Sequence, residues 1–252
     1  MTELSLAHIY QEGDILSHDE RVTIYLTKDT PLKYDVNKWR YHKMPSFSEW
    51  KMDLKKQYDM HMAQGSPHLA FDFPPNVKLT DTFKAEALKR GFEVGYIEMY
   101  AIEPADLISD TQKHVEIQEV TEETIEDYIM VHKRFALPYG KDYMLESSQM
   151  IRDTFGDNPL KHLVIAYVDQ QPVGILDMFI QKETIEIDGF GVTEDMRHQG
   201  IGRAMQAYVA KRAKARTIIL VADGEDTAKD MYVKQGYTFI GYRYQILKEN
   251  IQ

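Results

Sequence analysis

The first half of the chain alternates between strand-like and helix-like patterns of apolar residues. Strict alternation of apolar and polar side chains is typical of half-buried strands, and apolar residues three and four apart are typical of helices. Ser48 is a candidate N-cap for the first helix, and Gly91 ends the second. We expect strands at residues 21–27, 69–73 and 92–102, and helices at 46–63 and 80–90.

The second half has a clearer order of elements. Thr121 is a candidate N-cap for its first helix, and a Leu-Pro-Tyr-Gly break at 137–140 separates that helix from the next. We expect strands at 115–120, 163–168, 173–181, 184–192, 217–222 and 237–247, and helices at 122–135, 143–155, 200–215 and 227–234. Three consecutive strands joined by tight turns predict a mixed, mostly antiparallel sheet. Helices flank this sheet, so the predicted fold class is α/β, in an α+β layered form.

A polar stretch at 103–113, which contains Pro104 and has no period, separates the two halves. We therefore place a domain boundary there, between a smaller domain at 1–110 and a second domain at 111–252. The two halves share a weak internal sequence similarity. Residues 89–92 (KRGF) resemble residues 234–237 (KQGY), and each segment follows a predicted helix and begins a predicted strand. This similarity indicates either a duplication or only the common use of glycine to end a helix.

Composition excludes several classes of function. The formal net charge of −10 argues against a protein that binds nucleic acid by neutralising phosphates. The absence of cysteine excludes disulfides, cysteine-ligated zinc and a cysteine nucleophile, and it fits a reducing cytoplasm. Residues 1–14 lack the pattern of a signal peptide, and no apolar run is long enough to cross a membrane. The nine histidines show no paired ligand spacing, so we expect no metal.

The segment at 186–203 (EIDGFGVTEDMRHQGIGR) carries the candidate chemistry. A strand runs through a polar turn into a helix whose first turn contains Gly200 and Gly202, so a ligand can approach the unpaired N–H groups there. Arg197 and Arg203 add positive charge, which favours a phosphate or pyrophosphate. The spacing fits neither the dinucleotide fingerprint nor a Walker loop.

Residues 115–247 resemble the GNAT superfamily of N-acetyltransferases. The turn and helix start at 191–202 match the superfamily's acetyl-CoA motif, a strand follows at 217–222, and residues 228–237 (AKDMYVKQGY) match its Ala-x-x-Leu-Tyr-x-x-x-Gly-Phe/Tyr signature. One departure is Glu225, which stands where the family often has Asn, within the acidic segment 223–226. That segment could lie near the cofactor or the acceptor, or could simply begin a helix favourably.

The resemblance implies a cofactor site and a proton donor. In the family the sheet splits between the strands at 186–192 and 217–222, the thioester lies in the split, and a backbone donor near Val192 polarises its carbonyl. Tyr232 would protonate the departing CoA thiolate, or else it is a packed aromatic residue. The implied cofactor-binding residues are Phe190, Gly191, Val192, Arg197, His198, Gln199, Gly200, Ile201, Gly202 and Arg203.

The acceptor amine must lose a proton before it can attack. Glu186 occupies the position of the glutamate in histone-acetylating members, and Asp188 lies on the same strand face; a chain of water molecules is the alternative to either. Tyr139 and Tyr143 lie in the region that walls the acceptor site in the family. The first half lacks the cofactor motif and has Ala87 where the second half has Tyr232, so it would be a degenerate copy.

These observations predict an acetyl-CoA-dependent N-acetyltransferase that acts in a ternary complex on a primary amine, carried by a small molecule or a protein. The first alternative is a non-catalytic acyl-CoA-binding regulatory or interaction module. The second is acyl transfer from an aminoacyl-tRNA, which the net charge disfavours. We expect no nucleic-acid or membrane partner, and the sequence leaves the oligomeric state open, a homodimer included.

Overall fold

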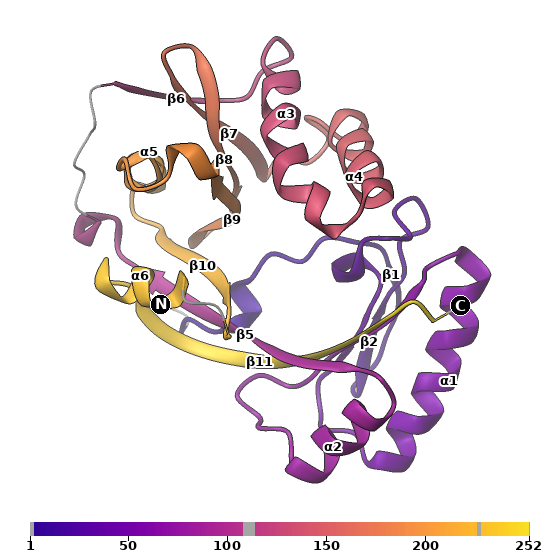
Figure 1. Ribbon diagram of the computed structural model, residues 1–252. Coiled ribbons are helices and arrows are strands. Elements are labelled where there is room, and N and C mark those ends of the chain that lie inside the picture. The colour runs from indigo at the N-terminus through magenta and orange to yellow at the C-terminus, as the bar shows by residue number, and fades with distance from the viewer. Residues whose placement is uncertain (1–2, 108–113, 226–227, 252) are drawn as a thin grey trace.

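One sheet runs through both halves of the chain (Figure 1). The computed structural model describes residues 3–107, 114–225 and 228–251. In these residues the strand order is β1-β2-β3-β4-β11-β5-β10-β9-β8-β7-β6. The strands are β1 (Ile15–His18), β2 (Val22–Tyr25), β3 (Trp39–Tyr41), β4 (His68–Asp72), β5 (Glu93–Ile102), β6 (Val115–Glu119), β7 (Lys161–Val168), β8 (Gln171–Ile180), β9 (Thr184–Val192), β10 (Thr217–Asp223) and β11 (Thr238–Glu249). The α-helices are α1 (Phe47–Gln64), α2 (Asp81–Lys89), α3 (Ile125–Ala136), α4 (Lys141–Asp153), α5 (Ile201–Ala213) and α6 (Ala228–Lys234).

The predicted α/β class, with a mixed sheet flanked by helices, is confirmed. The sequence patterns missed β1 and β3. All four residues of β1 are exposed, and β3 has only three residues, so neither shows an interpretable alternation.

Two predicted helix caps were wrong. Ser46, not Ser48, caps α1, because the Ser46 side chain and Glu49 form a reciprocal capping box. In the second half the N-cap residue is Thr124 rather than Thr121, and α3 begins at Ile125. Thr121 instead donates its N–H to Thr124 Oγ1 at 2.9 Å, in the turn before the helix.

The last strand of each half lies against the other half. β5 pairs with β10 from Ile97 to Ile102, and β11 pairs with β4 from His68 to Asp72. β5 and β11 also pair with each other at the centre of the sheet. Backbone hydrogen bonds therefore join the two halves of the chain directly. The predicted domain boundary, at residues 110 and 111, lies outside the described residues and stays a prediction.

The internal sequence similarity corresponds to a local two-fold relation between β5 and β11. If Gly91 is aligned with Gly236, Ile97 corresponds to Tyr242 and Glu98 to Arg243. In the sheet Ile97 pairs with Arg243 and Glu98 pairs with Tyr242, so the two pairs exchange under the alignment. The parallel pair β3·β4 likewise corresponds to the parallel pair β9·β10. This repeated pairing supports a duplication.

Helices cover both faces of the second half of the sheet (Figure 1). The buried residues of α5 pack with β8, β9 and β10 in one apolar core, whereas α3 and α4 pack with β7 and β8 in another. A Cβ atom at Gly191 would lie 2.7 Å from the Phe135 ring of α3, so glycine permits this close approach. No helix in the described ranges is long and apolar enough to span a membrane.

Candidate active site

The sheet opens between β9 and β10, as the family resemblance predicts. The two strands pair in parallel only from Thr184 and Thr217 to Ile187 and Leu220. Beyond that point β10 stays with β5 up to Asp223, and β9 stays with β8 up to Val192. The two strands therefore diverge and leave their facing edges available to a ligand.

A bulge near Gly189 changes which side chains β9 presents to each face. Three residue steps of β9 span two steps of β8 there, and Gly189 has a φ of +54°. Before the bulge, Glu186 faces away from α5. After the bulge, Phe190 and Val192 pack against the core that contains α5. One strand thus presents carboxyl groups to one face and apolar groups to the other.

The backbone at the end of β9 offers a donor to the split. Thr193 N–H donates to Val173 O of the β8 side at 2.8 Å. Successive N–H groups along a strand point to opposite sides, so Val192 N–H points toward the opening. An acceptor oxygen in the split would meet this group.

The turn after β9 leads directly into the N-terminus of α5. Gly200 is the N-cap residue with a φ of +80°, a left-handed conformation that favours glycine. The first N–H groups of α5 have no partner within the helix and lie at its positive end. Arg197 Nε donates to Val192 O at 3.2 Å, which fixes the turn against the strand. The result is a helix start next to the split whose N–H groups are suited to an anion.

A cleft of about 780 Å³ joins this helix start to α6. Tyr232 of α6 is half-buried at its edge, and its ring packs edge-on against Tyr237 at 5.6 Å. All ten cofactor-binding residues predicted from the sequence line this one cleft, together with Tyr232. The lining residues are Phe190, Gly191, Val192, Met196, Arg197, His198, Gln199, Gly200, Ile201, Gly202, Arg203, Gln206, Met231, Tyr232 and Gln235.

The acidic segment after β10 packs against β5. Tyr96 and Gly224 exchange two hydrogen bonds, from Tyr96 OH to Gly224 O at 2.9 Å and from Gly224 N–H to Tyr96 O at 2.8 Å. Glu225 is exposed, and its N–H donates to Asp223 Oδ1 at 2.9 Å. Asp226, the last residue of the segment, lies outside the described residues, as does Thr227, the predicted start of the helix. The first half therefore supports one wall of the split.

Glu186 is buried on the other face of β9 and does not line the cleft between the start of α5 and α6. It is 4% exposed, and its Oε2 accepts the N–H of Tyr10 at 2.5 Å. Burial raises the pKa of Glu186 to about 8, against the lowering effect of that hydrogen bond. The N-terminal segment thus covers this carboxyl group, and the Tyr10 ring stacks on Phe179 at 4.3 Å.

Asp188 differs from Glu186 in being exposed to solvent at the mouth of the split. It pairs across the ladder with Asp177 of β8. Surrounding protein atoms and the nearby negative charge of Asp177 raise the pKa of Asp188. Of the two carboxyl groups proposed from the sequence, Asp188 is exposed and Glu186 is buried.

Comparison with known proteins fits this geometry. A domain of unknown function (DUF5613) matches residues 4–100, and the acetyltransferase (GNAT) family matches residues 117–237. The crystal structure of a functionally unknown conserved protein from Staphylococcus epidermidis is 44% identical, covers 98% of both chains and has a TM-score of 0.93. The second half of the chain, residues 117–237, belongs to the acetyltransferase (GNAT) family.

Two solved GNAT structures share the fold at low identity. A GCN5-related N-acetyltransferase from Kribbella flavida is 16% identical over 92% of this chain and 88% of its own, with a TM-score of 0.65. One from Sphaerobacter thermophilus is 13% identical over 93% of this chain and 82% of its own, with a TM-score of 0.58. No curated protein matches the chain. Membership of the GNAT family supports an acyl-transfer function.

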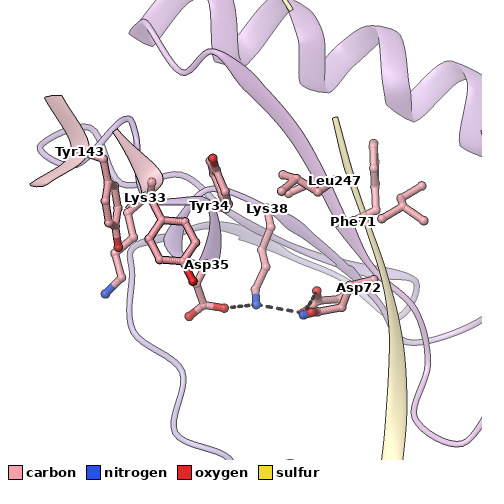
Figure 2. A pocket seen from close by; sticks show the side chains of 12 residues that line it. Lys33, Tyr34, Asp35, Lys38, Phe71, Asp72, Tyr143 and Leu247 are labelled. Atoms are coloured by element: carbon pink, nitrogen blue, oxygen red, sulfur yellow. Dashed lines mark hydrogen bonds and ion pairs between the residues drawn. The ribbon is translucent and has the colours of Figure 1, made fainter. Parts of the chain in front are cut away.

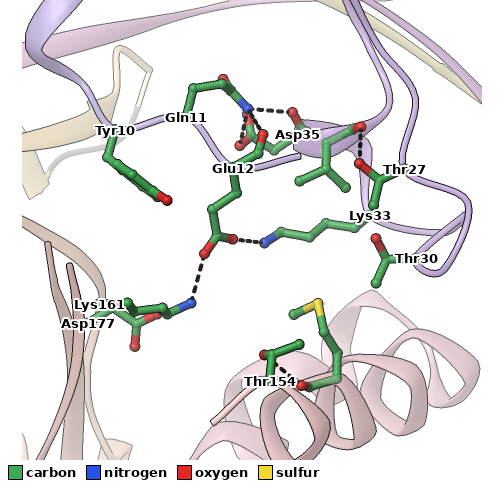
Figure 3. Close-up of polar contacts among 12 residues, drawn as sticks. Tyr10, Gln11, Glu12, Thr27, Thr30, Lys33, Asp35, Thr154, Lys161 and Asp177 are labelled. Carbon is green, nitrogen blue, oxygen red and sulfur yellow. Dashed lines mark hydrogen bonds and ion pairs between the residues drawn. The ribbon is translucent and has the colours of Figure 1, made fainter. Parts of the chain in front are cut away.

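This GNAT protein also has a chain of ion pairs that sequence reasoning missed (Figure 3). Glu12 lies between Lys33 at 2.6 Å and Lys161 at 3.2 Å, and Lys161 contacts Asp177 at 3.0 Å. Burial alone would raise the pKa of Glu12, but the two lysines lower it to about 2. These ion pairs link Glu12 and Lys33 of the first half to Lys161 and Asp177 of the second half, next to the strand that carries Asp188. No local sequence pattern at position 12 indicates them.

A second missed cluster surrounds Asp72 in β4. Asp72 Oδ2 lies 3.0 Å from Lys38 Nζ, 3.0 Å from Arg40 and 3.9 Å from Arg243, and all four side chains are largely buried. Gln245 Nε2 donates to the other oxygen at 2.9 Å. The one available signal was a charged residue inside the apolar run LAFDF. Among the described residues, no three His, Asp or Glu side chains are placed to hold a metal ion.

Proposed function

We propose that the protein is an acetyl-CoA-dependent N-acetyltransferase that transfers the acetyl group directly to a primary amine in a ternary complex. The observation that carries this proposal is that one cleft joins the open edge of β9, the glycine-containing start of α5 and Tyr232. The open edge of β9 is suited to an extended arm that contains amide groups, and the start of α5 is suited to a pyrophosphate. Tyr232 is suited to protonating a leaving thiolate.

The cofactor would lie along the cleft in that order. The N–H groups at the start of α5, with Arg197 and Arg203, would hold the pyrophosphate. The edge of β9 from Phe190 to Val192 would pair with the pantetheine arm, because β10 no longer covers it. Val192 N–H would then donate to the thioester carbonyl and stabilise its developing negative charge.

The transfer then needs one proton acceptor and one proton donor. The amine nitrogen attacks the thioester carbon, and its proton goes to Asp188, directly or through one water molecule. The carbon–sulfur bond breaks, and the thiolate takes a proton from Tyr232. Because the chain has no cysteine, no acetyl-cysteine intermediate forms. We assign the base role to Asp188 because it is exposed at the split, whereas Glu186 is buried against Tyr10.

Substitution of Arg197 by glutamate tests the cofactor site. Calorimetric titration of the wild type with acetyl-CoA should show micromolar binding, and Arg197→Glu should weaken it about 10- to 100-fold because a charge-assisted contact becomes a repulsion. The control Lys182→Glu makes a similar charge reversal at an exposed residue outside the cleft and should leave binding unchanged. If the wild type does not bind acetyl-CoA, the proposed function fails. Binding without turnover on any amine would instead indicate a non-catalytic acyl-CoA-binding module.

Removal of the Tyr232 hydroxyl group tests the proton donor. Tyr232→Phe should lower kcat about 100-fold while the Kd of acetyl-CoA stays within about threefold, since the ring remains and only the proton is lost. Tyr208→Phe on α5, whose side chain does not line the cleft, is the matched control. Release of CoA measured with a thiol reagent reports kcat. An unchanged kcat in Tyr232→Phe would assign protonation of the thiolate to another group.

A further inference from the structure

A second pocket, of about 320 Å³, lies between the two halves of the protein (Figure 2). One wall comes from the segment of residues 33–38 in the first half, and another from Tyr139 and Tyr143 in the second. Its floor includes Ala70 of β4 and Leu247 of β11, which are paired strands. The pocket therefore exists only because the last strand of the second half lies against the first half.

The surface that this pocket offers is mainly apolar. Tyr139 is 74% exposed, and its ring packs edge-on against Tyr143 with centroids 6.0 Å apart. Tyr34 also lines the pocket, and its hydroxyl donates to Glu249. Aromatic rings with aliphatic side chains opposite them are suited to a flat or branched apolar group.

The charged groups of the pocket restrict what can enter. Lys33 is paired with Glu12, and Lys38 reaches between Asp35 and Asp72 (Figure 2). These lysines already occupy the carboxylates of Glu12 and Asp72, which are therefore not free to bind a second ammonium group deep in the pocket. Asp35 remains half-exposed, with a side chain 55% exposed, so it can still accept a contact from one cation. This arrangement suits a ligand with a single positive charge.

The N-terminal segment connects this pocket to the split in the sheet. Tyr10 N–H contacts Glu186 of β9, the Gln11 side chain donates to Asp35, and Glu12 contacts Lys33 of the pocket (Figure 3). Tyr10 and Gln11 are adjacent residues, so their contacts place Asp35 of the pocket close to the strand that carries Asp188.

We propose that this pocket holds the apolar body of the acceptor, and that the acceptor is a monoamine with an aromatic or branched alkyl group. Its single ammonium group would face Asp35 and Asp188, and its body would lie between Tyr139 and Leu247. The inference rests on the proposed N-acetyltransferase function and adds the substrate class.

The test compares amines that differ in body and in charge. With acetyl-CoA saturating, phenethylamine and isopentylamine should show a kcat/KM at least about tenfold above ethylamine, spermidine and a lysine-containing peptide, because only the first two bury an apolar body without a second charge. Tyr139→Ala should raise the KM for phenethylamine about five- to tenfold, and Leu247→Trp, which fills the pocket, should raise it at least as much. Tyr58→Ala, on the exposed side of α1, is the control and should change nothing.

A binding measurement separates the proposed acceptor class from the proposed N-acetyltransferase function on which it rests. Titration of phenethylamine into the CoA-saturated protein should show binding that Tyr139→Ala and Leu247→Trp weaken, while all variants keep the acetyl-CoA affinity of the wild type. If spermidine or the peptide is preferred and neither pocket variant changes its KM, the inference is overturned and the acetyltransferase function stands. If acetyl-CoA does not bind, both are overturned.

Discussion

Replacement of Asp72 by asparagine is expected to lower the free energy of unfolding by about 3–5 kcal/mol, the usual cost of breaking a buried ion pair from one side. Asp72 is 2% exposed and is the shared partner of Lys38, Arg40 and Arg243. Asparagine keeps the shape of the aspartate side chain and can still form hydrogen bonds. The decrease in the free energy of unfolding therefore reports the removal of the negative charge. Two of the three cations, Lys38 and Arg243, are themselves more than nine-tenths buried and would lose this carboxylate.

The same substitution has a predictable pH dependence. Burial alone would raise the pKa of Asp72, but the three cations outweigh burial and hold this pKa well below its ordinary value. A carboxyl group with a lowered pKa contributes stability that is complete above the ordinary pKa of about 4 and is lost as the pH falls toward the folded-state value. The difference between wild type and Asp72→Asn should therefore be constant near neutral pH and shrink below about pH 4.

Urea unfolding followed by circular dichroism between pH 3 and pH 8 measures both effects. Asp59→Asn, at an exposed position of α1, is the matched control and should change the free energy of unfolding by less than about 0.5 kcal/mol. A loss below about 1 kcal/mol in Asp72→Asn would mean that the cluster relaxes to other partners or to water.

Replacement of Asp188 by asparagine is expected to lower kcat/KM for the amine about 100- to 1,000-fold, the usual contribution of a positioned general base. The side chain is exposed, so the fold and the acetyl-CoA affinity should be retained. The loss should appear mainly in kcat, because the amide still occupies the site but cannot take the proton. Steady-state kinetics at saturating acetyl-CoA measure it.

Glu186→Gln is the informative comparison, because Glu186 lies two residues away on the same strand. It should cost less than about tenfold, since its carboxyl group is buried against Tyr10. The pH profile distinguishes the two. A base must be unprotonated, so activity falls as the pH drops through its pKa, and that pKa is raised for both groups. A fall centred near pH 8 that Glu186→Gln removes would make Glu186 the base, whereas a fall at lower pH that Asp188→Asn removes supports our assignment.

The cleft at the start of α5 could be predicted from the sequence because its parts are close together along the chain. The strand edge, the turn and the helix start span residues 190–203, and the backbone geometry that they need is encoded locally by Gly200 and Gly202. Tyr232 required the family signature, since a lone tyrosine on a short helix is usually a packing residue. The difference between Glu186 and Asp188 was not predictable, because it depends on a bulge and on a segment more than 170 residues away.

The sequence by itself determined the fold class, most of the helices and strands, and a set of residues that line one cleft at the start of α5. Only the tertiary structure decided how the halves combine, with β5 and β11 each placed against the other half. It also decided the ion pairs that join Glu12 to Lys33 and Lys161, and the pocket that Asp72 and Leu247 both line. The physical reason is that hydrophobic periodicity reports which face of an element is buried, but not what covers it. Buried ion pairs and pockets form between faces that are distant in sequence, and no local pattern specifies their partners.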